Sequence, residues 1–477
     1  MVWRLDRPHK PALPSSFFWT WDHSTNHVLD EDGLQNSGCY NAYLKGTETY
    51  VEDYRRLTDL AADLGVKGVI IWGFLRDSHG GVEASKRVAG YAASKGVAIM
   101  PGVGTTWYGG CYYEGDHPYN IERFLREHPE ARILRRDGSL YEFAGRYGIS
   151  PRHPAFLQWL QDGIRWLFRE FEIGGVNLEN GDFMEDYHPL TLEFARTWPA
   201  DDVPFFRFQA MSYIPAVEAV ADLLDAKLVT YATYTGFVPG EITREGEEDP
   251  NCTHFMGLKP PAMLERIHPQ AVCQWTLSGM LHERPLPLTA FLDDGAPAEA
   301  LENPKWPAGV VQPGKRAVGF VHQGSQWYGY GPQPNGTRYV QVISAIKEAC
   351  LRAYRAGLEG VGIHGEVSPR FVPAALNYLA FSHFLHWPED SLRGFARGTL
   401  AQVLGSETEA EEFVEVLAHL DAGTLSEELR TLAVRRHVER ERALGSLGRA
   451  ALQPWRFWQW LDYLCRGYTE RQTVSII

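Results

Sequence analysis

The chain has 477 residues, 44% hydrophobic and 22% charged, which allows one large domain with an extension or two to three domains. Its net charge is −14, from 46 Lys and Arg against 60 Asp and Glu, which argues against nucleic acid as a partner. No hydrophobic run reaches about 18 residues, so we expect no membrane partner. The first residues lack a signal-peptide core, which predicts a cytoplasmic protein, with a trimmed secreted chain as the alternative.

Eight short hydrophobic runs recur along the chain, connected by segments with helical periodicity. Such runs are typical of parallel strands that are buried on both faces. Eight strand–helix alternations predict an α/β fold, a closed (β/α)8 TIM barrel, with an open doubly wound sheet as the alternative. The runs lie at 17–21, 68–73, 97–103, 175–179, 227–232, 271–275, 317–322 and 360–364.

The barrel is predicted to occupy residues 1–390, and the Leu-, Ala-, Glu- and Arg-rich residues 391–477 are predicted to form a C-terminal helical domain. These helices either cover the barrel or join two protomers into a homo-oligomer. Three long loops follow strands, at 104–153, 236–270 and 282–315, on the face where barrel enzymes keep their active sites. The first loop is expected to hold a helix over 120–127 and a turn at Asp137-Gly138.

Aromatic residues make up 13% of the chain, including 15 Trp and 22 Tyr, and many stand in Gly-rich segments. Flat rings beside polar groups suit a sugar, because a pyranose has an apolar face and a hydroxylated edge. Any single Trp is readily a core residue, but five at strand ends or in following loops favour sugar platforms. These are Trp21, Trp72, Trp107, Trp275 and Trp327.

Acidic residues follow the fourth predicted strand, in the order Glu179, Asn180, Gly181, Asp182. Burying an acid at a strand end costs free energy unless it is paired or used. Two neighbouring carboxyls can divide the roles of proton donor and anion. The alternative is a pair of hydrogen-bonded structural carboxylates.

Polar residues also follow other strands. The eighth strand carries His364 and Glu366, and Glu366 is either a second catalytic carboxylate or bonded to backbone groups of the next loop. The remaining candidates are hydroxyl-binding groups, with an ordinary loop ion pair of Arg76 with Asp77 or Asp22 as the alternative. They are Asp22, His23, Arg76, Asp77, His79, His322 and Gln323.

A metal site is an alternative, in which five of these residues converge on a divalent ion, as in metal-dependent sugar isomerases. They are Glu179, Asp182, His322, His364 and Glu366. Our main prediction includes no metal and no cofactor. The six cysteines are scattered without a Cys-x-x-Cys or a Cys/His cluster, which predicts free thiols.

Three motifs resemble barrel glycoside hydrolases: His128-Pro129-Glu130, Asp137-Gly138 and Ser150-Pro151, ahead of the acid-bearing strand at 175–179. The strand-4 acids are also similar to those of the substrate-assisted hexosaminidases of families 18, 20, 84 and 85. That resemblance implies that one group orients the substrate N-acetyl and the other is the acid. Family 20 has an adjacent Asp-Glu pair, whereas here two residues separate Glu179 from Asp182.

The sequence therefore predicts an exo-acting glycoside hydrolase with a carbohydrate substrate. Glu179 is the expected general acid, and Asp182 or Glu366 is the nucleophile, the base or the N-acetyl orienter. Two alternatives are a metal-dependent sugar isomerase or lyase, and a non-catalytic sugar-binding protein on the same barrel.

Overall fold

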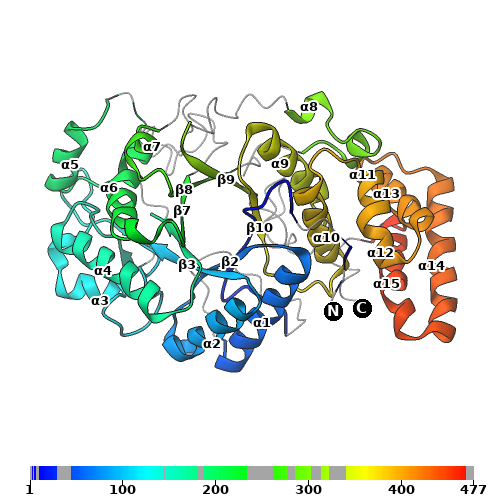
Figure 1. The fold of residues 1–477 in the computed structure, drawn as a ribbon, viewed down its shortest axis with the longest axis horizontal. Helices are drawn as coiled ribbons and strands as arrows, with labels where there is room; N and C mark the ends of the chain where they lie inside the picture. Colours follow the sequence, from blue (N-terminus) through cyan, green and yellow to red (C-terminus); the bar gives the residue numbers. More distant parts are fainter. Residues whose placement is uncertain are drawn as a thin grey trace.

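The computed structural model describes residues 3, 5–6, 10–28, 45–143, 145–180, 186–200, 202, 204–233, 261–276, 285–301, 313–321 and 340–468. Eight parallel strands close into a barrel in the order β1-β2-β3-β6-β7-β8-β9-β10 (Figure 1). Each strand overlaps the hydrophobic run predicted for it, so the expected (β/α)8 barrel is confirmed. The strands are β1 Phe17–Trp21, β2 Gly68–Trp72, β3 Ala98–Gly104, β6 Gly175–Glu179, β7 Leu228–Thr233, β8 Val272–Thr276, β9 Arg316–Val321 and β10 Val361–His364.

Amphipathic helices surround the barrel (Figure 1). In α1, the apolar residues at helical spacing, such as Val51, Tyr54 and Leu57, are buried, and Gly65 ends the helix in the left-handed conformation at φ 72°. The helices of the barrel region are α1 Thr47–Leu64, α2 Gly81–Ser94, α3 Ile121–Glu127, α4 Pro154–Glu170, α5 Pro189–Arg196, α6 Pro204–Glu218, α7 Met263–Arg266, α8 Ala298–Leu301, α9 Ile343–Ala356 and α10 Val372–His386.

The loop between β3 and α4 has structure of its own. It contains α3 and a two-stranded antiparallel sheet of β4 (Glu142–Phe143) and β5 (Arg146–Tyr147). The expected turn at Asp137-Gly138 is present, closed by an antiparallel bridge between Leu134 and Leu140. The two-stranded sheet lies a few residues further along the chain than the turn.

Side chains of the barrel strands form two separate clusters because successive residues of a strand face opposite sides. On β1, Phe18 faces outward and packs on Tyr378 of α10, with ring centroids 5.3 Å apart. Phe17, Trp19 and Trp21 face inward and join the cluster that fills the barrel. The inner cluster is rich in large aromatic rings, so the carboxyl end of the barrel is lined by them.

A helical region follows the barrel, as expected, and lies to one side of it (Figure 1, orange to red). Buried polar contacts hold it together. Trp458 Nε1 donates to Glu409 Oε1 at 2.6 Å, and His437 Nδ1 lies 2.7 Å from Asp462 Oδ2. Its helices are α11 Leu392–Phe395, α12 Ala401–Leu404, α13 Glu407–Asp421, α14 Glu427–Leu447 and α15 Arg449–Cys465, with a π-helical segment at Ala396–Leu400 between α11 and α12.

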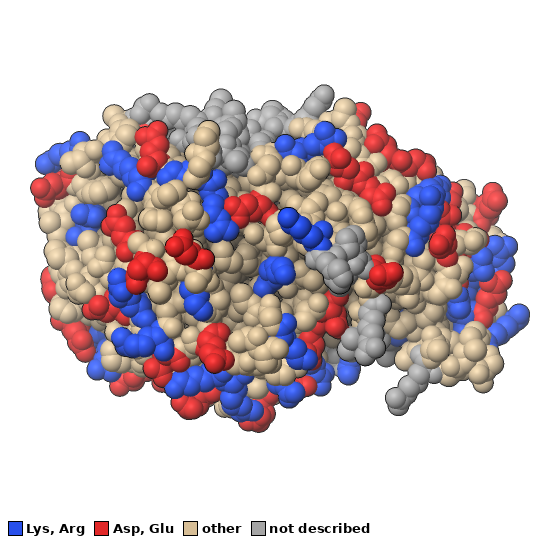
Figure 2. Space-filling view, viewed as in Figure 1, with Lys and Arg blue, Asp and Glu red and all other residues tan. Residues whose placement is uncertain are grey.

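Lys and Arg side chains interleave with Asp and Glu over the face seen in Figure 2. On this face the excess negative charge therefore forms no single large patch. Among the described residues, no helix combines the length and the hydropathy that a membrane crossing requires. The described cysteines, Cys111, Cys273, Cys350 and Cys465, are buried thiols.

Candidate active site at the carboxyl end of the barrel

Strand β6 presents Glu179 to the interior of the barrel. Two residues earlier on the same strand, Asn177 Nδ2 donates to Thr230 Oγ1 at 2.7 Å and to Gln274 Oε1 at 2.8 Å, from β7 and β8. This contact fixes the inward face of β6, and strand alternation then places Glu179 on the same face, one layer nearer the mouth. Gly104 is its partner on β3, so no side chain crowds Glu179 from that strand.

Side chains at the inner mouth are buried, and some keep a small exposed surface. Glu179 is 7% exposed and Trp19 and Tyr108 are 6% exposed, whereas Trp72 on the same inner face and Leu178 on the outer face are fully buried.

Packed aromatic rings form one wall of the mouth. The rings of Trp21 and Trp72 are 5.5 Å apart, and Tyr108 meets both edge-on at 5.7 and 5.5 Å. Trp107 stacks on Tyr108 at 5.0 Å. Tyr108 has a φ of 57°, a conformation that costs a non-Gly residue free energy and that clusters at functional sites.

The wall depends on a glycine in β3. A Cβ added to Gly102 would lie 2.3 Å from Trp72 Cδ2, so only a glycine leaves room for the indole. Trp72 is fully buried and supports the other rings, while Trp21 stands nearer the opening.

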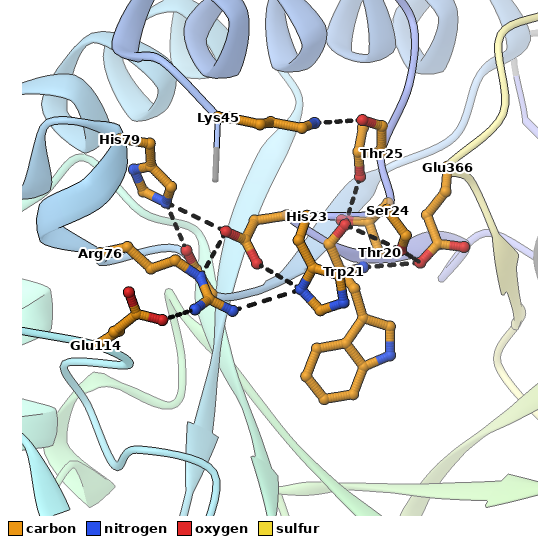
Figure 3. A network of polar contacts seen from close by, with 12 residues as sticks. Thr20, Trp21, His23, Ser24, Thr25, Lys45, Arg76, His79, Glu114 and Glu366 are labelled. Carbon is orange, nitrogen blue, oxygen red and sulfur yellow. Dashed lines mark hydrogen bonds and ion pairs between the residues drawn. The ribbon is translucent and has the colours of Figure 1, made fainter. Parts of the chain in front are cut away.

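Charged and imidazole side chains gather beside this wall, at the ends of β1 and β2 (Figure 3). Asp22 Oδ2 lies 2.6 Å from Arg76 Nε and 3.5 Å from His79 Nε2, and Asp22 Oδ1 lies 3.3 Å from His23 Nδ1. Arg76 also pairs with Glu114 and stands over the ring of Tyr113 at 4.3 Å. Four of these residues, Asp22, His23, Arg76 and His79, were predicted as hydroxyl-binding groups, and the structure brings them into one buried network.

Electrostatics fixes the protonation of this network. Burial alone would raise the pKa of Asp22, but Arg76, with His23 and His79, holds it well below its ordinary value. Burial alone would lower the pKa of Arg76, but Asp22, Tyr113 and Glu114 raise it. Burial lowers the pKa of His79 even though Asp22 opposes this. Asp22 and Arg76 are therefore an ion pair and His79 is neutral at pH 7.

Asp77 lies apart from the network, on the exposed turn after β2. It accepts from the Tyr112 hydroxyl at 2.5 Å and from the Asp116 backbone N–H at 3.1 Å. These contacts attach the β3–α4 loop to the β2–α2 loop. Asp77 thus anchors the loop that carries Glu114 and Tyr113.

Glu366 follows β10 and is fully buried. Its Oε1 accepts from the Trp21 backbone N–H at 2.8 Å and from the Ser24 hydroxyl at 3.0 Å (Figure 3), and its Oε2 lies 3.4 Å from His364 Nδ1. His364 packs between Trp19 and other inner rings. Because β10 and β6 are four places apart in the ring of eight strands, Glu366 and Glu179 stand on opposite sides of the barrel.

Two candidates face the helices instead of the mouth. Asn180 Oδ1 accepts from Gln209 Nε2 at 3.1 Å and from the Tyr213 hydroxyl at 3.2 Å, both on α6. Trp275 neighbours the inward Gln274 on β8 and belongs to the outer cluster. Both help to pack α6 and its neighbours on the barrel, and we leave them out of the proposed site.

Four candidates, Asp182, His322, Gln323 and Trp327, lie outside the described residues. Within the described ranges, no group of three or more His, Cys, Asp or Glu side chains is arranged to hold a metal ion. Asp182 and His322 of the metal alternative lie outside these ranges.

Sequence reasoning missed several residues of the mouth. Trp19 and Asn177 lie two positions before Trp21 and Glu179, so strand alternation could have indicated them. Tyr108 and Tyr113 stood in the aromatic Gly-rich segment but were not singled out. The sequence around Glu114 did not indicate its role, because its contact with Arg76 depends on how two separate loops meet in space.

No protein-family model matches the chain, and no curated protein matches it. Solved structures do. A β-N-acetylhexosaminidase from Bacteroides fragilis matches with a TM-score of 0.44 and 12% identity over 78% of this chain and 66% of that chain. A β-galactosidase from Halorubrum lacusprofundi matches with a TM-score of 0.45 and 12% identity over 85% of this chain and 65% of that one.

A family 138 glycoside hydrolase that targets pectin rhamnogalacturonan II matches with a TM-score of 0.46 and 8% identity over 98% of this chain and 58% of that one. The chain spans less than two thirds of the length of these three proteins. All three are glycoside hydrolases, the class that the sequence motifs resemble. The likeness is a distant one of fold, and the function proposed below rests on the residues of the site.

Proposed function

We propose that the chain is an exo-acting glycoside hydrolase in which Glu179 is the general acid. The observation that carries this proposal is the position of Glu179. It is an inward-facing carboxyl at the end of β6, 7% exposed, beside a wall of packed indole and phenol rings on β1, β2 and the loop after β3. A carboxyl in such a setting can protonate a leaving oxygen while the rings hold the apolar face of a sugar.

The reaction needs a second carboxylate to stabilise the oxocarbenium-like transition state or to activate water. Glu366 is one candidate, because it faces Glu179 across the barrel. Its Oε1 accepts from the Trp21 N–H and the Ser24 hydroxyl, and its Oε2 lies 3.4 Å from His364 Nδ1. Asp182, three residues after Glu179, is the other candidate.

Exo action is supported by the closed wall. The rings of Trp21, Trp72 and Tyr108 pack against one another and fill the side of β1 and β2. A space closed on one side suits the end of a glycan chain better than its middle. The substrate class is therefore a terminal sugar on an aryl, alkyl or glycosyl leaving group.

The first experiment is hydrolysis of a panel of aryl glycosides, including N-acetylhexosaminides of both anomers, with and without EDTA. We expect chelator-insensitive release from one glycoside. Loss of activity in EDTA together with stoichiometric bound metal would instead favour the isomerase or lyase. Sugar binding with no turnover on any glycoside would favour a non-catalytic binding protein.

Leaving-group dependence then tests the role of Glu179. Glu179→Gln is expected to lose roughly 10²- to 10⁴-fold in kcat/KM on glycosides with poor leaving groups. It should lose little on 2,4-dinitrophenyl glycosides, which leave without protonation. Glu83→Gln, an exposed change on α2, is the matched control. Equal loss on both leaving groups, or full activity, would remove Glu179 from the role of acid.

The same assay separates the two candidates for the second carboxylate. A nucleophile or base is needed whatever the leaving group, so its loss should abolish activity on 2,4-dinitrophenyl glycosides too. We expect this of either Glu366→Gln or Asp182→Asn. In Glu366→Gln the amide oxygen can still accept from the Trp21 N–H, so the loop contact is kept.

A further inference from the structure

Two ring nitrogens of the Asp22 network, His23 Nε2 and His79 Nδ1, are buried without a hydrogen-bond partner among the described residues, and His23 is the one beside Trp21. Its Nδ1 faces both Asp22 Oδ1 at 3.3 Å and Arg76 Nη2 at 3.4 Å. Its Nε2 is buried and has no hydrogen-bond partner among the described residues. A buried ring nitrogen without a partner costs free energy, which a bound ligand would recover.

The neighbours of His23 also make contacts with other groups. Asp22 is shared among Arg76, His23 and His79, and Arg76 is held by Asp22, Glu114 and the Tyr113 ring. His79 stacks on Tyr50 at 3.6 Å, and its Nε2 lies 2.8 Å from the Gly73 carbonyl oxygen. These groups orient the imidazole of His23 and have their own contacts to satisfy.

The imidazole stands beside the mouth. Its ring lies 5.8 Å from that of Trp21, and Figure 3 shows its Nδ1 turned toward Arg76. Trp21 belongs to the inner cluster of the barrel, on the wall that we assign to the sugar. A ligand packed on Trp21 would therefore come close to the Nε2 side of His23.

We propose that His23 is a specificity-determining residue that binds one sugar hydroxyl through Nε2, and that Asp22 and Arg76 are positioning residues for it. This inference rests on the proposed function, because it assigns a contact within the same site. If Nδ1 donates to Asp22, Nε2 accepts; if Nδ1 accepts from Arg76, Nε2 donates. A hydroxyl both donates and accepts, so it pairs with either tautomer.

The test combines deoxy analogues of the ligand with a substitution of His23. Free glucose, galactose, mannose, xylose, rhamnose and N-acetylglucosamine are titrated into the unmodified protein by calorimetry, and the deoxy analogues of the sugar that binds are titrated next. We expect removal of one hydroxyl to weaken binding roughly five- to tenfold. In His23→Phe, which keeps a ring beside Trp21, that same removal should cost nothing.

Controls and outcomes separate this inference from the proposed function. His419→Phe, the same change on α13 outside the barrel, should keep the full penalty for the deoxy sugar. His23→Ala replaces His23→Phe if the latter does not fold by circular dichroism. A protein that hydrolyses glycosides but keeps every deoxy penalty without His23 overturns this inference alone. A protein that neither binds nor hydrolyses any sugar overturns both.

Discussion

The buried Lys347 of α9 makes a quantitative prediction about stability. Its Nζ donates to the Pro388 carbonyl and lies 4.7 Å from the centre of the Phe384 ring, with no exposed surface. Burial lowers the pKa of Lys347 from 10.5 to about 8, and the nearby Cys350 and acidic groups only partly oppose this. The folded protein therefore favours the neutral amine more than the unfolded chain does.

The direction and size of the pH effect follow from this pKa. Between pH 8 and pH 10.5 the unfolded chain binds more protons at Lys347 than the folded protein, so stability rises with pH over this window. The difference of 10.5 − 8 = 2.5 corresponds to about 3 kcal/mol in the free energy of unfolding. Below pH 8 both states are protonated at Lys347, and the contribution is constant.

The assay compares urea unfolding of the unmodified protein and of Lys347→Met at pH 7, 8, 9 and 10. The substitution removes the titration but also the bond to Pro388, which shifts the whole curve by a pH-independent amount. We expect the free energy of unfolding of the unmodified protein to rise, relative to that of the variant, by up to about 1.4 kcal/mol per pH unit above pH 8. Parallel profiles across this range would refute the reasoning.

Three other substitutions test the packing of the site and of the helical region. Asp22→Asn should destabilise the protein by about 3–5 kcal/mol in urea unfolding, because it removes the carboxylate beside Arg76 Nε and leaves only Glu114 to balance the buried guanidinium; a change under 1 kcal/mol would contradict the buried pair. Gly102→Ala should cost about 1–3 kcal/mol and change the tryptophan fluorescence, since its Cβ would meet Trp72; an unchanged spectrum would contradict this contact. Glu409→Gln should cost about 1.5–3 kcal/mol and speed hydrogen exchange in α13 to α15, because the carboxylate that pairs with Arg440 is lost; unaltered exchange there would count against it.

Much of the fold could be predicted because its signals are local. Each strand of the barrel coincides with a short hydrophobic run, and helices such as α1 have their apolar residues at a period that the sequence displays. The turn at Asp137-Gly138 and the cap at Gly65 depend on residue types that favour those backbone conformations. These features need no knowledge of which elements meet in space.

The site could be predicted only in part. Glu179 could be singled out from its local sequence alone, because a carboxyl directly after an apolar strand is unusual. The ion pair of Arg76 with Asp22 was one of the expected alternatives, but the contact of Arg76 with Glu114 could not be predicted, because it joins residues 38 positions apart through the meeting of separate loops. The anchoring of Glu366 on the Trp21 backbone likewise crosses 345 positions of sequence.

The sequence by itself determined the number, order and type of the barrel elements and the acids at the strand ends. Only the tertiary structure decided which side chains face the barrel interior. Strands of a parallel barrel are buried on both faces, by helices outside and by side chains inside, so hydrophobicity does not tell the two apart. Trp21 and Trp275 look equivalent in the sequence, yet one lines the mouth and the other packs beneath the helices. Closure of the barrel decides which side chains face inward, because it sets the register of all eight strands together.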